Sequence, residues 1–266
     1  MSRLSEVFAR CKSEKRAALV GYLTAGDPNV DTSKELLLTL AKQVDILEIG
    51  MPFSDPMADG PVIQAASERA LASGTHIADV FELAHIVRKT NPDIGIVLMG
   101  YANTPFVLGF DIFSKQAVAA GVDAVLLVDI PPEEGYLCDP IFKQYGLDRI
   151  LLLSPTSTDE RIKLASKHAS GFIYYVSLNG ITGANIGEMS AIKQKVANIR
   201  VHTDLPVCVG FGVKTPQQAS EVAEFSDGVV VGSHFVGQIP AHATQNEAMV
   251  SSINDAAQAM KTAMQT

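Results

Sequence analysis

Short runs of apolar residues alternate along the chain with longer segments in which apolar residues recur every three or four positions. The short runs predict strands at residues 18–24, 44–50, 94–101, 122–128, 149–153, 171–177, 206–210 and 227–231. The longer segments predict helices, for example at 110–120, 133–145, 158–168, 188–199 and 215–224. Strands that alternate with helices imply right-handed crossovers and therefore a parallel sheet.

Eight strand-helix units favour a closed α/β barrel over an open, doubly wound sheet. No linker rich in proline, glycine or serine divides them, so we expect a single (β/α)8 TIM-barrel domain over residues 1–266. Extra helices are expected at 3–15 and 61–73 and after Gly232-Ser233, and the stretch at 245–264 is expected to be the last outer helix. The first of these helices places Leu4, Val7, Phe8 and Cys11 on one face, which we expect to cover the bottom of the barrel.

Composition and charge exclude several classes of protein. Apolar residues make up 47% of the chain and charged residues 19%, as in an ordinary folded enzyme. A net charge of −8 without a block of Lys or Arg argues against a nucleic-acid partner. The chain begins without a signal-peptide core, and its apolar runs are shorter than the ~20 residues of a membrane span. Cys11, Cys138 and Cys208 form no CxxC pair, which predicts reduced, buried thiols and a cytoplasmic protein.

Glu48 is the most unusual residue in the predicted strands, because its neighbours in the second strand are apolar. Alternation turns Ile46, Glu48 and Gly50 toward the barrel interior, and Leu47 and Ile49 toward the helices. A buried carboxylate is costly unless it is paired or functional, and desolvation raises its pKa toward the range that suits proton transfer. A glutamate held by a structural partner is the alternative, and the residues alone do not decide between the two.

Other candidate polar groups lie at the carboxyl ends of the predicted strands, where barrel enzymes carry their active sites. They are Tyr22, Thr24, Tyr101, Asn103, Asp129, Tyr174 and Ser177. Asp55 and Asp59 lie in the loop after the second strand, although most aspartates in such turns bond only nearby backbone amides. The same loop carries Phe53 and Met57, which we expect to be exposed and to cover a ligand or a partner surface.

Glycine-rich turns follow the last three predicted strands, at 180–183, 210–212 and 232–233. Glycine lets the backbone approach a ligand closely, and backbone N–H groups bind phosphate, so the turns together predict a phosphate site. No lysine lies in a predicted strand or at a strand end, which disfavours a Schiff-base aldolase. The histidines form no cluster that indicates a metal site. We therefore expect acid/base chemistry on a phosphorylated substrate, without metal or cofactor.

The run at 47–61, LEIGMPFSDPMADGP, resembles the signature of the tryptophan synthase α-subunit family. The resemblance covers nearly the whole chain in order, through residues 24–28, 101–103, 129–131, 174–183, 210–212 and 232–233. It implies a lyase of tryptophan biosynthesis that cleaves indole-3-glycerol phosphate into indole and glyceraldehyde 3-phosphate.

The resemblance also implies roles for individual residues. Glu48 would be the acid/base residue, Asp59 would hydrogen-bond the indole N–H, and Tyr174 would help to place Glu48 and the substrate. The phosphate site would consist of Gly183, Gly212, Gly232 and Ser233, and the indole pocket would be lined by Tyr22, Tyr101 and Phe211. We expect the segment 178–190 to be a lid that brings Thr182 toward Asp59.

Two positions depart from some relatives of the family. Tyr22 stands where others have phenylalanine, and Leu178 stands where some have arginine, so no charged latch is assigned to the lid.

Members of this family usually work in an α2β2 heterotetramer, whose β subunit uses pyridoxal phosphate to join indole with serine. The resemblance therefore implies a β-subunit partner and no cofactor in this chain. The alternatives are a free-standing indole-3-glycerol-phosphate lyase and a weakly catalytic subunit that mainly activates its partner. A different phosphosugar barrel enzyme would share the phosphate site but not the signature after the second strand.

Overall fold

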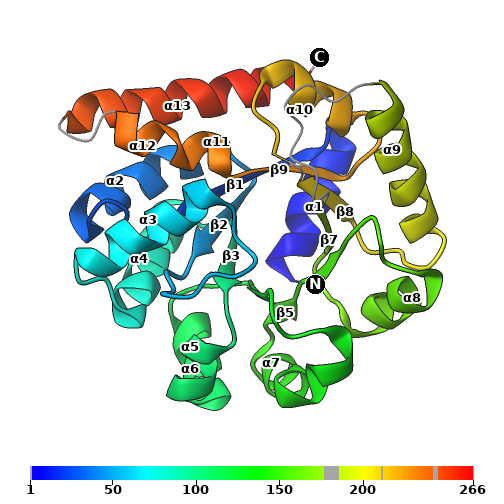
Figure 1. The fold of residues 1–266 in the computed structure, drawn as a ribbon, viewed down its shortest axis with the longest axis horizontal. Helices are drawn as coiled ribbons and strands as arrows, with labels where there is room; N and C mark the ends of the chain where they lie inside the picture. Colours follow the sequence, from blue (N-terminus) through cyan, green and yellow to red (C-terminus); the bar gives the residue numbers. More distant parts are fainter. Residues whose placement is uncertain (1, 177–185, 211, 242–244, 266) are drawn as a thin grey trace.

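A parallel sheet surrounded by helices forms the centre of the molecule (Figure 1). The structure is a computed structural model that describes residues 2–176, 186–210, 212–241 and 245–265. Its strands are β1 (Ala18–Thr24), β2 (Ile46–Gly50), β3 (Gly95–Gly100), β4 (Ala124–Leu127), β5 (Asp148–Arg149), β6 (Leu151–Leu153), β7 (Ile173–Val176), β8 (Val207–Gly210) and β9 (Gly228–Val231). Their order across the sheet is β5-β4-β3-β2-β1-β9-β8-β7-β6.

The two ends of this order belong to a single extended segment, which confirms the predicted barrel. β5 pairs with β4, β6 pairs with β7, and only Ile150 separates β5 from β6. The amide of Ile150 donates to the carbonyl of Val125 across 3.0 Å, so the segment stays in the sheet at the break. The strand predicted at 149–153 is thus present as two halves that join the edges of the sheet.

Helices follow the strands around the outside of the barrel. In the described part of the chain they are α2 (Val30–Ala41), α3 (Pro61–Ala72), α4 (Ile77–Thr90), α5 (Asn103–Leu108), α6 (Phe110–Ala119), the 3-10 helix η1 (Pro132–Leu137), α7 (Asp139–Tyr145), α8 (Asp159–His168), α9 (Ile186–Arg200), α10 (Pro216–Ala223), α11 (Ser233–Val236), α12 (Gln238–Ala241) and α13 (Asn246–Ala263). Among these described helices, none has the length and apolar character that crossing a bilayer requires.

The prediction of a continuous helix at 133–145 was wrong. The segment forms η1 and then α7, with Cys138 between them. Pro140 explains the break, because proline lacks the N–H that a continuing helix needs but is tolerated in the first turn of a new one.

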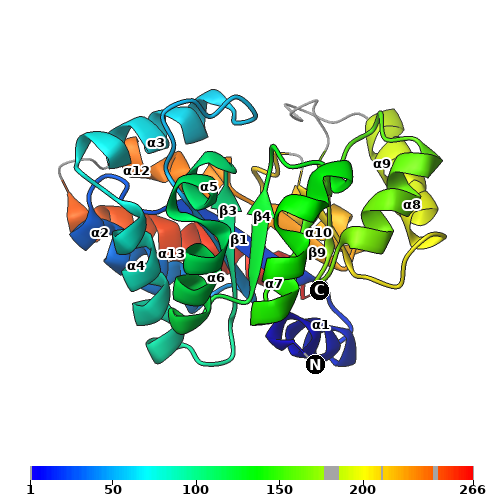
Figure 2. The same ribbon diagram turned by 90° about the horizontal axis from the view of Figure 1, so that it is seen from below.

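An additional helix, α1 (Arg3–Ser13), covers the end of the barrel at which the strands begin, as predicted (Figure 2). Its residues Leu4, Val7, Phe8 and Cys11 are buried and pack in one cluster with inward-facing strand residues such as Ile46. Leu47 and Ile49 belong instead to the larger cluster between the strands and the surrounding helices. The alternation predicted for the second strand is therefore confirmed, and it places Glu48 on the interior face.

Candidate active site

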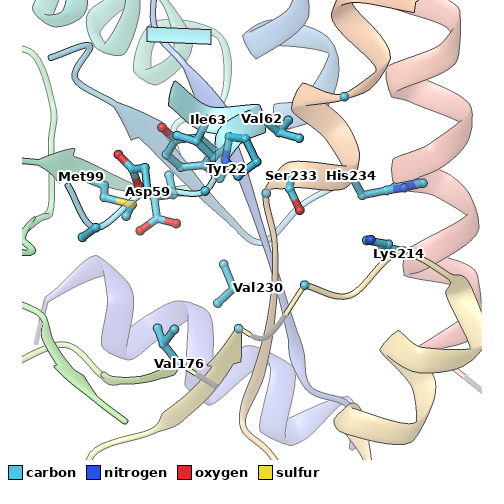
Figure 3. Close-up of a pocket in the computed structure, with 18 of the residues that line it drawn as sticks. Tyr22, Asp59, Val62, Ile63, Met99, Val176, Lys214, Val230, Ser233 and His234 are labelled. Carbon is cyan, nitrogen blue, oxygen red and sulfur yellow. The ribbon is translucent and has the colours of Figure 1, made fainter. Parts of the chain in front are cut away.

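A cavity of about 760 Å3 lies at the carboxyl ends of the strands (Figure 3). Side chains from several βα connections converge on it, as is usual for the active sites of barrel enzymes. The described residues that line it are Tyr22, Glu48, Ala58, Asp59, Gly60, Pro61, Val62, Ile63, Met99, Tyr174, Val176, Gly210, Gly212, Lys214, Val230, Gly232, Ser233, His234, Gly237 and Gln238. The wall thus consists mostly of apolar side chains, tyrosines and glycines, with few charged groups.

Glu48 is 1% exposed and lies on β2 beside Tyr22 of β1 and Val97 of β3. Neither carboxylate oxygen has a hydrogen-bond partner among the described residues, although both oxygens are buried. Burial, and secondarily the negative charge of Asp59, raises the pKa of Glu48 to about 8. A carboxyl group in this state holds its proton near neutral pH. It can donate that proton to a substrate, because no described residue forms a hydrogen bond with the carboxyl group.

Asp59 is held in the loop between β2 and α3 by contacts on both sides. Tyr101 donates from its hydroxyl to Asp59 Oδ2 across 3.1 Å, and the same hydroxyl accepts from the amide of Ala58 across 2.9 Å. Gln64 Nε2 donates to the carbonyl of Asp59 across 2.8 Å. Burial raises the pKa of Asp59, and the hydrogen bond from Tyr101 opposes this rise. The carboxylate therefore has a defined orientation at the cavity wall.

Two tyrosines form the aromatic part of the wall, and glycines on neighbouring strands make room for them. Tyr22 forms a hydrogen bond with Thr24 across 3.2 Å, and a methyl group on Gly50 would lie 2.1 Å from the Tyr22 hydroxyl. Tyr174 is 9% exposed, and a methyl group on Gly210 would lie 2.7 Å from its hydroxyl. Gly210, which belongs to a predicted phosphate turn, lines the cavity and also gives space to Tyr174.

The opposite side of the cavity is formed by the connections that follow β8 and β9. Gly212 has a φ of +76°, a left-handed conformation that favours glycine, and Ser233 begins α11 directly after Gly232. Asp59 and Lys214 lie on opposite sides of the view in Figure 3, with Val230 between them. The cavity thus has an acidic end at β2 and a glycine-rich end at β8 and β9.

The sequence profile of the family described as "Tryptophan synthase alpha chain" matches residues 8–265. The chain belongs to this family. The tryptophan synthase alpha chain of Marinobacter nauticus is 46% identical over 265 residues, which cover 99% of this chain and 98% of the relative. The one from Geobacter sulfurreducens is 49% identical over 237 residues, 89% of each chain.

Solved structures of tryptophan synthase subunits have the same fold. The crystal structure of tryptophan synthase subunit alpha from Legionella pneumophila matches with a TM-score of 0.92 at 38% identity, covering 99% of this chain and 98% of that one. A structure of Mycobacterium tuberculosis tryptophan synthase matches with a TM-score of 0.92 at 32% identity, covering 100% and 99%. The resemblance to the tryptophan synthase alpha family is therefore confirmed along the chain.

Most of the residues that this resemblance singles out lie on one cavity. Glu48, Asp59, Tyr22, Tyr174, Gly212, Gly232 and Ser233 all line it. Thr182, Gly183 and Phe211 lie outside the described residues, as does the segment 178–185 of the expected lid. Tyr101, which is 3% exposed, lies behind Asp59 and contacts its carboxylate.

Other polar candidates have local partners away from the cavity. Asp129 accepts from the amide of Ala102 across 2.8 Å, and Asp55 accepts from the hydroxyl of Ser54 across 2.6 Å. Met57 is 78% exposed, as expected of a surface residue. Phe53 was expected to be exposed too, but it is half-buried because its ring stacks on that of Tyr101, with centroids 5.1 Å apart.

Several residues that line the cavity of this tryptophan synthase alpha family member were not predicted from the sequence. Met99, Val176 and Val230 could have been found by alternation, since each lies two residues from another inward-facing position on its strand. Val62 and Ile63 belong to the first turn of α3, directly after the Asp59 loop. Lys214 and His234 gave no signal, because each follows a glycine turn rather than a strand.

Proposed function

We propose that this chain is a lyase that cleaves indole-3-glycerol phosphate into indole and glyceraldehyde 3-phosphate. One observation carries the proposal: Glu48 is buried without a described partner on the wall of a cavity that it shares with Asp59. Nothing in barrel packing requires a glutamate at this position, and an unpaired buried carboxyl group is destabilising. A role in proton transfer explains why Glu48 is present although its burial destabilises the fold.

The acid/base step follows from the protonation state of Glu48. With a pKa near 8, Glu48 is protonated near neutral pH and donates its proton to C3 of the indole ring. The positive charge that develops on the indole nitrogen is stabilised by Asp59, whose carboxylate accepts a hydrogen bond from the indole N–H.

The retro-aldol step then restores the enzyme. The carboxylate of Glu48 accepts the proton of the hydroxyl group on the carbon attached to C3, and that oxygen forms the aldehyde carbonyl. The carbon–carbon bond breaks, and its electron pair returns to the indole ring. Glu48 ends the cycle protonated, so the step needs no added oxidant or reductant.

The proposed substrate fits the layout of the cavity. Its indole ring lies against Tyr22, Tyr174 and the apolar side chains near them, and its phosphate lies at backbone groups of Gly212, Gly232 and Ser233. Tyr174 helps to place Glu48 and the substrate. Phe211, Thr182 and Gly183 keep their predicted roles in substrate binding. Tyr101, predicted to line the indole pocket, acts on the substrate through Asp59, whose carboxylate it contacts.

We further propose a tryptophan synthase β subunit as partner in an α2β2 heterotetramer. Four large side chains, Met57, Phe106, Val107 and Tyr136, are 68–78% exposed and follow the neighbouring strands β2, β3 and β4 at their carboxyl ends. Such a concentration of exposed apolar surface fits a partner interface. Pyridoxal phosphate would belong to the β subunit, with no cofactor in this chain, and the complex would work in the cytoplasm, where the free thiols of the three cysteines stay reduced.

The test is to incubate the chain with indole-3-glycerol phosphate, alone and with a tryptophan synthase β subunit, and to measure indole and glyceraldehyde 3-phosphate. We expect equal amounts of both products and faster release with the β subunit. Absence of both products under both conditions would refute the proposed reaction. Release that the β subunit leaves unchanged would refute the partner and support the free-standing lyase.

A further inference from the structure

A lysine lines the glycine-rich end of the cavity and has no assigned role. Lys214 lies in the connection between β8 and α10, on the side of Ser233 and His234 in the view of Figure 3. Its ammonium group forms no ion pair or hydrogen bond with any described residue. The other ionisable residues described along the wall are Tyr22, Glu48, Asp59, Tyr174 and His234.

The backbone at Lys214 is held on both sides. Val213, which precedes it, is 1% exposed and belongs to the larger apolar cluster between the strands and the surrounding helices. The amide of Lys214 donates to Gln218 Oε1 across 2.9 Å, and the amide of Gln218 donates to Thr215 Oγ1 across 3.2 Å in the capping box of α10. The lysine side chain therefore extends from a fixed point at the rim of the cavity.

The charges around the cavity are arranged along its length. The carboxylate of Asp59 lies at one end, beside the protonated Glu48, and Lys214 at the other end is the one permanent cation among the described lining residues. Burial lowers the pKa of His234, which disfavours its charged form. The chain carries a net charge of −8, so an anionic ligand approaches against a repulsive field that a local cation offsets.

We propose that Lys214 determines the specificity of the site for a phosphorylated substrate, by pairing its ammonium group with the phosphate dianion. This inference rests on the proposed function and adds a side-chain charge to the backbone phosphate site. Because Asp59 and Glu48 lie at the far end, the lysine also determines the orientation in which the substrate binds. The phosphate is drawn to β8 and β9, and the indole ring is left beside Glu48 and Asp59.

Binding of glycerol 3-phosphate and of inorganic phosphate to the full chain tests the pairing without any turnover. Calorimetry should show binding of both probes weakened about fivefold to tenfold in Lys214→Met and largely retained in Lys214→Arg. The matched control is Lys143→Met on α7, an exposed lysine away from the cavity whose loss changes the net charge equally. Raising the salt concentration should weaken binding more in the wild type than in Lys214→Met.

Measurements of turnover distinguish a role of Lys214 in phosphate specificity from a general structural effect of replacing it. For indole-3-glycerol phosphate, Lys214→Met should raise KM with kcat unchanged, because the pairing is the same in the ground and transition states. For the dephosphorylated compound indole-3-glycerol, the two proteins should be equally active. Equal slowing with both compounds would overturn the inference.

The inference and the proposed function fail in different ways. Phosphate binding that stays within twofold of the wild type in Lys214→Met overturns the role of Lys214, whether or not indole is released. Phosphate binding that depends on Lys214 in a chain that releases no indole supports this role and refutes the lyase reaction.

Discussion

The hydroxyl of Tyr101 lies 3.1 Å from Asp59 Oδ2 and 2.9 Å from the amide nitrogen of Ala58. Tyr101 directly follows β3, whereas Asp59 lies in the loop after β2, so one βα connection orients a carboxylate that belongs to its neighbour. Phe53 stacks on the tyrosine ring and so helps to fix its position. Tyr101 is thus a positioning residue for Asp59.

Tyr101→Phe should therefore impair the reaction through Asp59. The variant keeps the ring stack but loses the hydrogen bond that opposes the rise in the pKa of Asp59. We expect kcat to fall about tenfold or more, as for loss of a hydrogen bond to a charged group, and the acidic limb of the pH–rate profile to move to higher pH.

A double-mutant cycle checks this link. In an Asp59→Asn background, adding Tyr101→Phe should have little further effect on kcat, because the group that it positions has already been removed. Independent, additive losses together with an unshifted pH profile would mean that Tyr101 has only a structural role.

The raised pKa of Glu48 predicts a pH-dependent stability. Between its ordinary value of 4.5 and about 8, the folded protein keeps a proton on Glu48 that the unfolded chain releases. The contribution of the neutral carboxyl group is therefore fully present below the lower value, and it is lost as the pH rises through the upper one. Glu48→Gln lacks this titration, so its free energy of unfolding should rise relative to the wild type from about pH 5 to about pH 9. Urea unfolding at several pH values measures the difference, and a constant difference would contradict a raised pKa.

An ion pair with a fully buried aspartate predicts a large stability effect. Arg69 of α3 donates to Asp27 through two nitrogens, at 2.7 and 2.8 Å, and the Asp27 side chain is fully buried. Arg69→Met should lower the free energy of unfolding by about 3 kcal/mol, because it leaves an uncompensated buried charge. The matched control is Arg161→Met, which breaks the exposed pair with Glu133 and should lower the free energy of unfolding far less, because solvent screens that pair. Equal urea midpoints for the two variants would contradict the importance of the buried pair.

The barrel and the buried carboxyl group of Glu48 could be predicted because both depend on local alternation. A strand that is apolar on both faces except at Glu48 shows directly which residue is out of place. The prolines of the segment 131–140 also indicate that the helix there is interrupted. The prediction of a continuous helix was wrong because it considered only the spacing of apolar residues. Burial and spacing thus suffice for elements that the sequence encodes within a few residues.

The contacts across the site could not be predicted in the same way. The bond between Tyr101 and Asp59 joins residues 42 positions apart, and its existence depends on how two neighbouring connections pack. Lys214 comes four residues after Gly210, the last residue of β8, so only the path of the turn decides that it reaches the cavity. Such contacts between side chains on different loops leave no periodic pattern in a single sequence.

Glu48 is the group that we propose to transfer the proton, and the reaction depends on it most directly. The decisive measurement is the rate of indole release from indole-3-glycerol phosphate near neutral pH by the wild type and by Glu48→Gln. The wild type should release indole and glyceraldehyde 3-phosphate in equal amounts, and the folded variant should be slower by about 10²–10⁴-fold, because an amide of nearly the same shape cannot exchange the proton. Indole release by Glu48→Gln at a rate close to that of the wild type would contradict proton transfer by Glu48.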